Sequence, residues 1–192
     1  MQPVTLRTPR LVLDLPAERD IELVTHYCQD PLFERFLTTP WPYTDAHARG
    51  FLTEYVPEAW VAGSELTWAI RPEVGSPLMG VISLRTGPRE IGFWLGAEHR
   101  GSGVMAEATT ALCDWAFAGG VPGIDTISWR ANAGNVASAS VARASGFINT
   151  TTDAGTVPGR DGVDLPAWSG ERGAVIDARA HDSWQSILGG GR

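Results

Sequence analysis

The sequence predicts one domain of the mixed α/β class, built on a largely antiparallel sheet. Three short apolar segments, at 66–72, 78–86 and 90–96, are separated by hairpin-length turns and predict an antiparallel meander. Helical and strand patterns alternate after this meander. A strand–helix–strand unit over 90–131 must then cross over to a parallel neighbour. The 192 residues are enough for one hydrophobic core, and neither a repeat nor a low-complexity stretch divides them.

Strand and helix signals also alternate before the meander. Residues 10–15, RLVLDL, alternate in polarity and predict a strand that ends at Pro16. Residues 18–28 carry apolar side chains at helical spacing and predict a helix. After the two prolines of TTPWPYT, Thr44 or Asp45 is placed to cap a second helix that runs towards Trp60.

The chain after the meander begins with a helical pattern from Val104 to the glycines at 119–120. A strand is predicted at 125–131, and a short helix follows over 136–144, capped by an asparagine and ended by Gly146. Residues 150–173 have little periodicity and predict one weak strand inside a long hairpin or loop. The last segment, HDSWQSILG at 181–189, predicts a final strand.

Charge and composition argue against several classes of function. The net charge is −7, and the sequence contains no cluster of Lys or Arg that could bind a phosphate backbone, so nucleic acid is not an expected partner. Cys28 and Cys113 lack metal or redox spacing, and the four histidines are isolated, so no metal site is predicted. No apolar run approaches the roughly 18 residues of a membrane span, and no leader pattern begins the sequence. We therefore expect a cytoplasmic protein without a membrane partner.

The stretch Gly101-Ser102-Gly103-Val104-Met105-Ala106 predicts a phosphate-binding turn. It opens a helix, whose free N–H groups and dipole favour a pyrophosphate, while glycine lets the backbone approach it. The stretch also fits the G-x-G-x-x-A dinucleotide fingerprint, which leaves an NAD(P)-dependent oxidoreductase as an alternative. That alternative is disfavoured because Asp125, the acidic residue at the right distance, precedes its strand, and because the strand before the turn follows a meander.

The segment from Arg100 to Met105 resembles the R-x-x-G-x-G/A acyl-coenzyme A loop of the GNAT acetyltransferases, with Met105 departing at the last position. EIGFWL before the loop, AEA in its helix, N-x-x-S at Asn135 to Ser138, and GF at 146–147 are similar to the ribosomal-protein N-acetyltransferase (RimJ/RimL-like) branch. The resemblance covers roughly residues 6–148 and the terminal HDSWQSIL. It implies a single GNAT domain over 1–192 with the α/β (α+β) GNAT fold: a mixed, mostly antiparallel sheet of six to seven strands, flanked by about four helices and splayed at the acyl-CoA site.

The resemblance implies an acyl-CoA-dependent N-acetyltransferase. Such an enzyme transfers an acetyl group from acetyl-CoA, or another acyl group, directly to a primary amine of a small molecule or a protein N-terminus. No metal takes part, and a homodimer is left open as the assembly. The non-enzymatic alternative is an acyl-CoA-binding sensor that keeps the loop but lacks a working base.

The resemblance also implies which residues bind acyl-CoA: Phe93, Trp94 and Leu95 through their backbones, then Arg100, Gly101, Ser102, Gly103, Val104, Met105 and Ala106, and finally Asn135 and Ser138. Asn135 is expected to contact the pantetheine arm, and Ser138 to protonate the departing thiolate. Helix capping by Asn135 and a plain helix-face serine are the structural alternatives.

An ammonium must lose a proton before it can attack, so a base is expected. Glu90 is the first candidate, with Glu171 and Asp177 as weaker ones, although Glu90 could equally be a solvated residue at a strand edge. Glu107, in the first turn of the loop helix, is interpreted as structural. Among eight tryptophans, Trp41, Trp60 and Trp168 would border an acceptor cleft, but core packing explains most tryptophans better.

Overall fold

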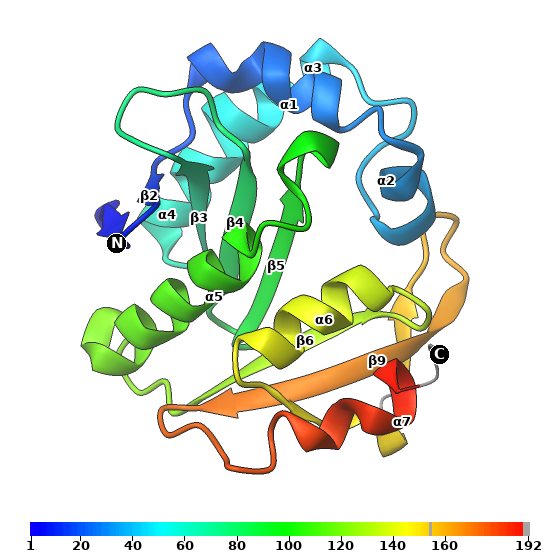
Figure 1. The fold of residues 1–192 in the computed structure, drawn as a ribbon. Coiled ribbons are helices and arrows are strands. Elements are labelled where there is room, and N and C mark those ends of the chain that lie inside the picture. Colours follow the sequence, from blue (N-terminus) through cyan, green and yellow to red (C-terminus); the bar gives the residue numbers. More distant parts are fainter. Residues whose placement is uncertain (154, 190–192) are drawn as a thin grey trace.

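The computed structural model describes residues 1–153 and 155–189, and within them nine strands form one sheet. The strand order is β1-β2-β3-β4-β5-β6-β9-β7, with β8 paired to β9 alone. The bounds are β1 Leu6–Arg7, β2 Val12–Asp14, β3 Glu65–Arg71, β4 Gly80–Arg85, β5 Glu90–Leu95, β6 Thr126–Asn132, β7 Ile148–Asn149, β8 Thr156–Pro158 and β9 Asp164–Gly173. Every pair is antiparallel except β5 with β6 (Figure 1). The predicted fold class is confirmed, and strands of two or three residues raise the strand number above the expected six to seven.

The helices of the described residues are α1 Ile21–Tyr27, α2 Pro31–Phe36, α3 Asp45–Gly50, α4 Val56–Ala62, α5 Val104–Trp115, α6 Val136–Ala144 and α7 Gln185–Leu188. A π-helical turn joins α3 to α4, so the predicted helix from Thr44 towards Trp60 is confirmed as one continuous segment. Thr44 caps it by accepting a hydrogen bond from the His47 amide at 3.4 Å. The helix α2 was not predicted, although Asp30 followed by Pro31 is a typical helix start: the Asp30 side chain accepts from the Leu32 amide.

Alternation in the meander separates the two faces of the sheet. Leu66 and Trp68 of β3 belong to the main core cluster, which also includes α5. Trp68 meets Trp60 of α4 and Trp115 of α5 edge-on, with ring centroids 4.9 and 5.3 Å apart. Ala69 packs instead into a second cluster with α1 and α3. Because neighbouring residues of a strand point to opposite faces, side chains in register with Ala69, such as Thr67, face away from α5.

The prediction for residues 150–173 is wrong about the strand, although the expected hairpin is present as β8 and β9: β9 is long and lies inside the sheet, between β6 and β7. Seven residues of β9 pair with β6, and β7 and β8 pair with β9 as well. The buried residues of β9 are Ala167, Gly170 and Arg172, so no large apolar side chain marks its buried positions in the sequence. A Cβ on Gly170 would lie 3.1 Å from the Trp184 ring, so glycine makes room for that indole.

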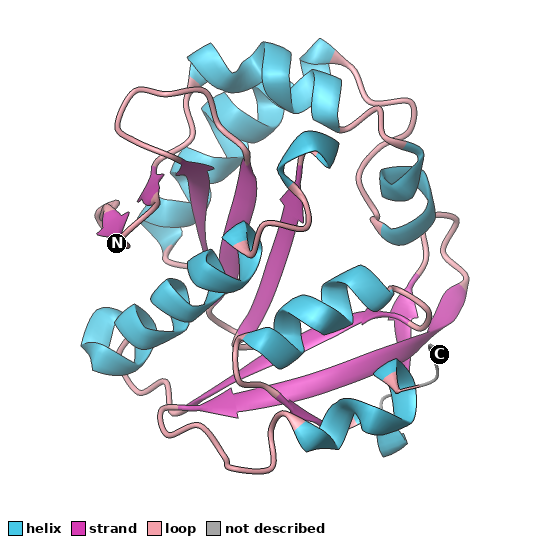
Figure 2. Cartoon of the chain, viewed as in Figure 1, coloured by secondary structure: helices cyan, strands magenta, loops and turns pink. Residues whose placement is uncertain are grey.

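The prediction of a final strand over 181–189 is also wrong. Residues 182–184 form a 3-10 turn and 185–188 form α7, as Figure 2 shows for the segment before the C-terminal end. Trp184 is fully buried, donates to the Phe147 carbonyl at 2.7 Å and meets Trp129 edge-on. Trp184, Ile187 and Leu188 all pack on the main core, and their i, i+3, i+4 spacing is helical.

Candidate active site

The parallel strands β5 and β6 separate shortly after they begin. Among the described residues they pair only at Glu90 with Ser128 and at Ile91 with Trp129. From Gly92 onwards β5 runs away from β6, and the divergence is visible in Figure 1. A cavity of about 860 Å³ occupies this fork and is lined by both strands, by α2 and by the start of α6. The splayed sheet expected at the acyl-CoA site is therefore present.

The glycine turn lies at the open end of the fork. Gly101 and Gly103 both have φ +77°, a left-handed conformation that favours glycine. A Cβ on Gly101 would touch nothing within 4 Å, and one on Gly103 would meet only Nη2 of Arg10, at 3.6 Å. The first helical hydrogen bond of α5 runs from the Glu107 amide to the Gly103 carbonyl, 3.0 Å. The amides of residues 104–106 therefore have no helical acceptor and can bind an anion, as a pyrophosphate requires.

Arg100 lines the fork, but its guanidinium is engaged within the protein. It forms an ion pair with Asp30 at 2.7 Å and donates to the Leu95 carbonyl at 2.9 and 3.2 Å. These contacts join the end of β5 to the start of α2. The Leu95 carbonyl, one of the groups expected to contact the pantetheine arm, is thus already hydrogen-bonded. The partner Asp30 was not identified from the sequence.

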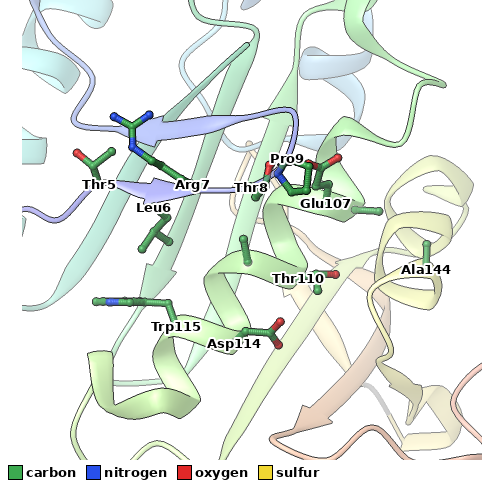
Figure 3. A pocket seen from close by; sticks show the side chains of 12 residues that line it. Thr5, Leu6, Arg7, Thr8, Pro9, Glu107, Thr110, Asp114, Trp115 and Ala144 are labelled. Carbon is green, nitrogen blue, oxygen red and sulfur yellow. Dashed lines mark hydrogen bonds between the residues drawn. The ribbon is translucent and has the colours of Figure 1, made fainter. Parts of the chain in front are cut away.

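Glu107 stabilises the turn rather than reaching into the fork. Its carboxylate accepts from Thr8 Oγ1 at 2.5 Å and from Arg10 Nε at 2.6 Å, and Arg10 also donates to the Ser102 carbonyl at 3.2 Å. Figure 3 shows Glu107 beside Thr8 and Pro9 at one end of a second, smaller cavity. Burial tends to raise the pKa of Glu107, but the hydrogen bonds from Thr8 and Arg10 outweigh it and hold the pKa below its ordinary value. The sequence did not identify Arg10.

Asn135 and Ser138 come together at the start of α6, on the wall of the fork. The Asn135 side chain caps the helix by accepting from the Ser138 amide at 3.1 Å. The indole nitrogen of Trp129 donates to Ser138 Oγ at 3.0 Å. Since an indole N–H can only donate, Ser138 accepts in this bond and keeps its own hydroxyl proton available for another acceptor.

Phe93 and Trp94 belong to the part of β5 that pairs with β4 but no longer with β6, and both line the fork. The Trp94 ring packs edge-on against Phe33 of α2 and Tyr27 of α1, with centroids 5.5 and 6.3 Å apart. This packing fixes the backbone of β5 where it leaves β6. Met105 is buried in the main core and also lines the fork, so the residue at which the loop differs from the family motif has a packing role.

Glu90 lies at the base of the fork in a row of side chains that crosses the sheet. Arg85 is its cross-strand neighbour on β4 and its ion-pair partner, and Glu65 is opposite Arg85 on β3. Glu171 is opposite Ser128 on β9 and exposed, two strands from Glu90. Asp177 does not line the fork; hydrogen bonds from Arg179 lower its pKa to about 2.

The remaining candidates do not line the fork. Trp60 is a core residue, and Trp41 and Trp168 pack on the edges of the two core clusters. Asp125 is exposed and ion-paired with Arg89 at 2.6 Å. Among the described residues no group of three His, Cys, Asp or Glu side chains could hold a metal ion. In the same part of the chain, no helix has the length and apolar character needed to cross a membrane.

Comparison with known proteins was made for both sequence and fold. The family model described as "Acetyltransferase (GNAT) domain" matches residues 10–148. The "Uncharacterized N-acetyltransferase p20" of Bacillus licheniformis is 26% identical over 118 residues, which are 59% of this chain and 66%, just under two thirds, of that protein.

Two solved structures share the fold at lower identity. The ribosomal L7/L12 alpha-N-protein acetyltransferase RimL, in complex with coenzyme A, has a TM-score of 0.73 at 19% identity and covers 91% of this chain and 100% of its own. The Microcin C7 self immunity acetyltransferase MccE, in complex with acetyl-CoA and AMP, has a TM-score of 0.71 at 20% identity over 86% of this chain and 93% of its own. With the family model covering most of the chain, from β2 to the start of β7, these findings confirm the predicted family: the protein belongs to the GNAT acetyltransferases.

Proposed function

We propose that this protein transfers an acetyl group from acetyl-CoA directly to a primary amine. The observation that carries the proposal is the fork between β5 and β6, which leads from an anion-binding helix start to a cavity on both sides of the sheet. The bound coenzyme in the MccE and RimL structures supports the same ligand here. The name of RimL supports a protein N-terminus as one acceptor class, beside small-molecule amines.

In this proposal the amides of residues 104–106 bind the pyrophosphate. The backbone of Phe93, which has no partner on β6, binds the pantetheine arm and the thioester oxygen. Gly101 and Gly103 keep side chains away from the phosphates. Three side chains support the shape of the site, since their polar groups already have partners in the protein. Ser102 Oγ donates to the His99 carbonyl at 3.0 Å, and Arg100 and Asn135 form the ion pair and the helix cap described above.

The reaction proceeds by direct attack. Glu90, itself or through a water molecule, takes a proton from the ammonium, and the amine nitrogen then forms a bond to the thioester carbonyl carbon. The C–S bond then breaks, and Ser138 donates its hydroxyl proton to the CoA thiolate. A second proton from the amine nitrogen returns to the Ser138 oxygen. The products are one amide, one thiol and one released proton. The free hydroxyl proton left by the Trp129 hydrogen bond supports the donor role of Ser138.

The activity is expected in the cytoplasm, with neither nucleic acid nor a membrane as partner, and in a monomer or a homodimer. The two buried free thiols, Cys28 and Cys113, suit a reducing compartment.

The test is a calorimetric titration with acetyl-CoA, CoA, NAD and NADP, followed by turnover assays on an amine panel. Micromolar binding of the CoA compounds together with amine acetylation supports the proposal. CoA binding without turnover of any amine would indicate a sensor instead, and NAD or NADP binding without CoA binding would indicate an oxidoreductase.

A further inference from the structure

The face of the sheet opposite α5 forms the floor of the fork cavity, and this inference rests on the proposed acetyl transfer. Two neighbouring rows of side chains cross the strands there in register, and all six residues line the cavity: Glu65, Arg85 and Glu90 in one row, and Thr67, Ser83 and Gly92 in the other. An acceptor that approaches from this side meets these two rows.

Thr67 has a buried hydroxyl without a partner. The residue is 1% exposed, and its Oγ1 has no hydrogen-bond partner among the described residues. Its backbone is fixed, because the Trp60 indole donates to the Thr67 carbonyl at 3.0 Å. Valine has nearly the same shape, favours strands equally and avoids the cost of an unsatisfied hydroxyl. A molecule in the cavity that Thr67 lines can supply the missing partner.

Ser83 places a second oxygen beside Thr67, next to an opening in the floor. A Cβ on Gly92 would lie 3.4 Å from Ser83 Oγ and within 4 Å of nothing else that is not adjacent in the chain. The space above Gly92 is thus open. Gly92 directly precedes Phe93, whose backbone is assigned to the thioester, so Ser83 lies beside the strand that holds the thioester and Thr67 lies one strand further along the same row.

The row of Glu65, Arg85 and Glu90 leaves one negative charge on the floor of the fork cavity. It contains two carboxylates, and Arg85, ion-paired with Glu90, neutralises only one of them. The hydrogen bond from the Tyr55 hydroxyl to Glu65, together with burial, raises the pKa of Tyr55 to about 12, so the phenol stays neutral. Three further cations of the cavity wall are engaged elsewhere: Arg35 lies over the Phe36 ring, Arg130 donates to the Thr156 carbonyl, and Arg100 is ion-paired with Asp30. One ammonium would neutralise the row.

We propose that the acceptor's primary ammonium binds to the hydroxyl oxygens of Thr67 and Ser83 beside Glu90, and that Thr67 determines acceptor specificity. An ammonium has three N–H donors, which the two hydroxyls and the carboxylate can accept. A carboxylate on the carbon next to the nitrogen would meet the net negative charge of the row formed by Glu65, Arg85 and Glu90 and be repelled. The favoured acceptors are therefore primary amines without an adjacent carboxylate, which include peptide N-termini and exclude free α-amino acids.

The test compares Thr67→Val, Thr67→Ser and wild type on n-butylamine, a short peptide with N-terminal alanine, alaninamide and alanine at saturating acetyl-CoA. Thr109→Val is the matched control, because Thr109 is also buried with an unpartnered hydroxyl but lines neither cavity. A lost hydrogen bond to a charged group lowers kcat/KM for the amine by roughly 10- to 100-fold in Thr67→Val. The Kd for acetyl-CoA stays unchanged, Thr67→Ser retains activity, and Thr109→Val behaves as wild type. Ser83→Ala repeats the test should Thr67→Val not fold.

Alaninamide should exceed alanine in kcat/KM by at least about tenfold in the wild type, from one unfavourable charge contact. The inference alone is overturned if the wild type acetylates amines while Thr67→Val and Ser83→Ala match it, or if alanine is used as well as alaninamide. A wild type that binds acetyl-CoA and acetylates none of the four amines refutes the acetyl transfer itself.

Discussion

Gly103→Val tests the phosphate-binding turn, and the structure separates its two consequences. The first is strain, because Gly103 has φ +77° and a β-branched residue in that conformation costs about 1–3 kcal/mol. For a chain of this length the melting temperature should fall by roughly 2–12 °C. The Cβ itself meets only the flexible end of Arg10, so crowding adds little. The positive φ is therefore the reason that this substitution should affect the fold as well as the coenzyme.

The second consequence is weaker coenzyme binding. The valine side chain would stand beside the free amides of residues 104–106, where the pyrophosphate must approach. Loss of one charge-assisted hydrogen bond weakens acetyl-CoA binding by roughly 10- to 100-fold. Gly75→Val is the matched control, because Gly75 has φ +84°, has open space around it and lines neither cavity.

Both variants should lose stability in thermal unfolding, but only Gly103→Val should lose acetyl-CoA affinity in calorimetry. Equal affinity in Gly103→Val, Gly75→Val and wild type would refute the placement of the pyrophosphate at this helix start.

Three further predictions concern one side chain of the fork and two that support neighbouring segments. Ser138→Ala should lower kcat while the Kd for acetyl-CoA is unchanged, and a loss of stability with normal kcat would leave Ser138 only its structural bond to Trp129. Arg160→Ala removes hydrogen bonds to four backbone carbonyls, those of Phe33, Glu34, Leu37 and Thr39. The free energy of unfolding should fall by about 1–2 kcal/mol, and the α2 segment should be cleaved faster by protease. An unchanged cleavage rate would contradict this. Glu107 has a pKa below its ordinary value, so its carboxylate stabilises the fold at pH values above the unfolded-state pKa. The difference in unfolding free energy between wild type and Glu107→Gln should therefore disappear as the pH falls through the folded-state pKa. A difference that persists in acid would contradict this.

Local patterns predicted the parts of the fold that depend on neighbours in the chain. The meander and the crossover from β5 to β6 follow from strand alternation, short turns and one helical period. The length of β9 was not predicted because its buried positions include the small residues Ala167 and Gly170, and at Gly170 the bulk comes from Trp184 instead. Trp184 was in turn assigned to a strand, since its helical spacing extends over barely one turn.

The candidate site also combines features that local sequence predicts with features that it does not. Backbone features, such as the glycine turn and the Asn135 cap, leave a local signature and could be predicted. The side-chain partners that complete the site come from distant segments: Asp30 binds Arg100, Arg10 holds Glu107, and neither pair has a local pattern. Thr67 is the clearest case, because in the sequence it is an ordinary strand residue. Only its burial without a partner, on the face that lines the fork, distinguishes it from a valine and points to an acceptor-binding role.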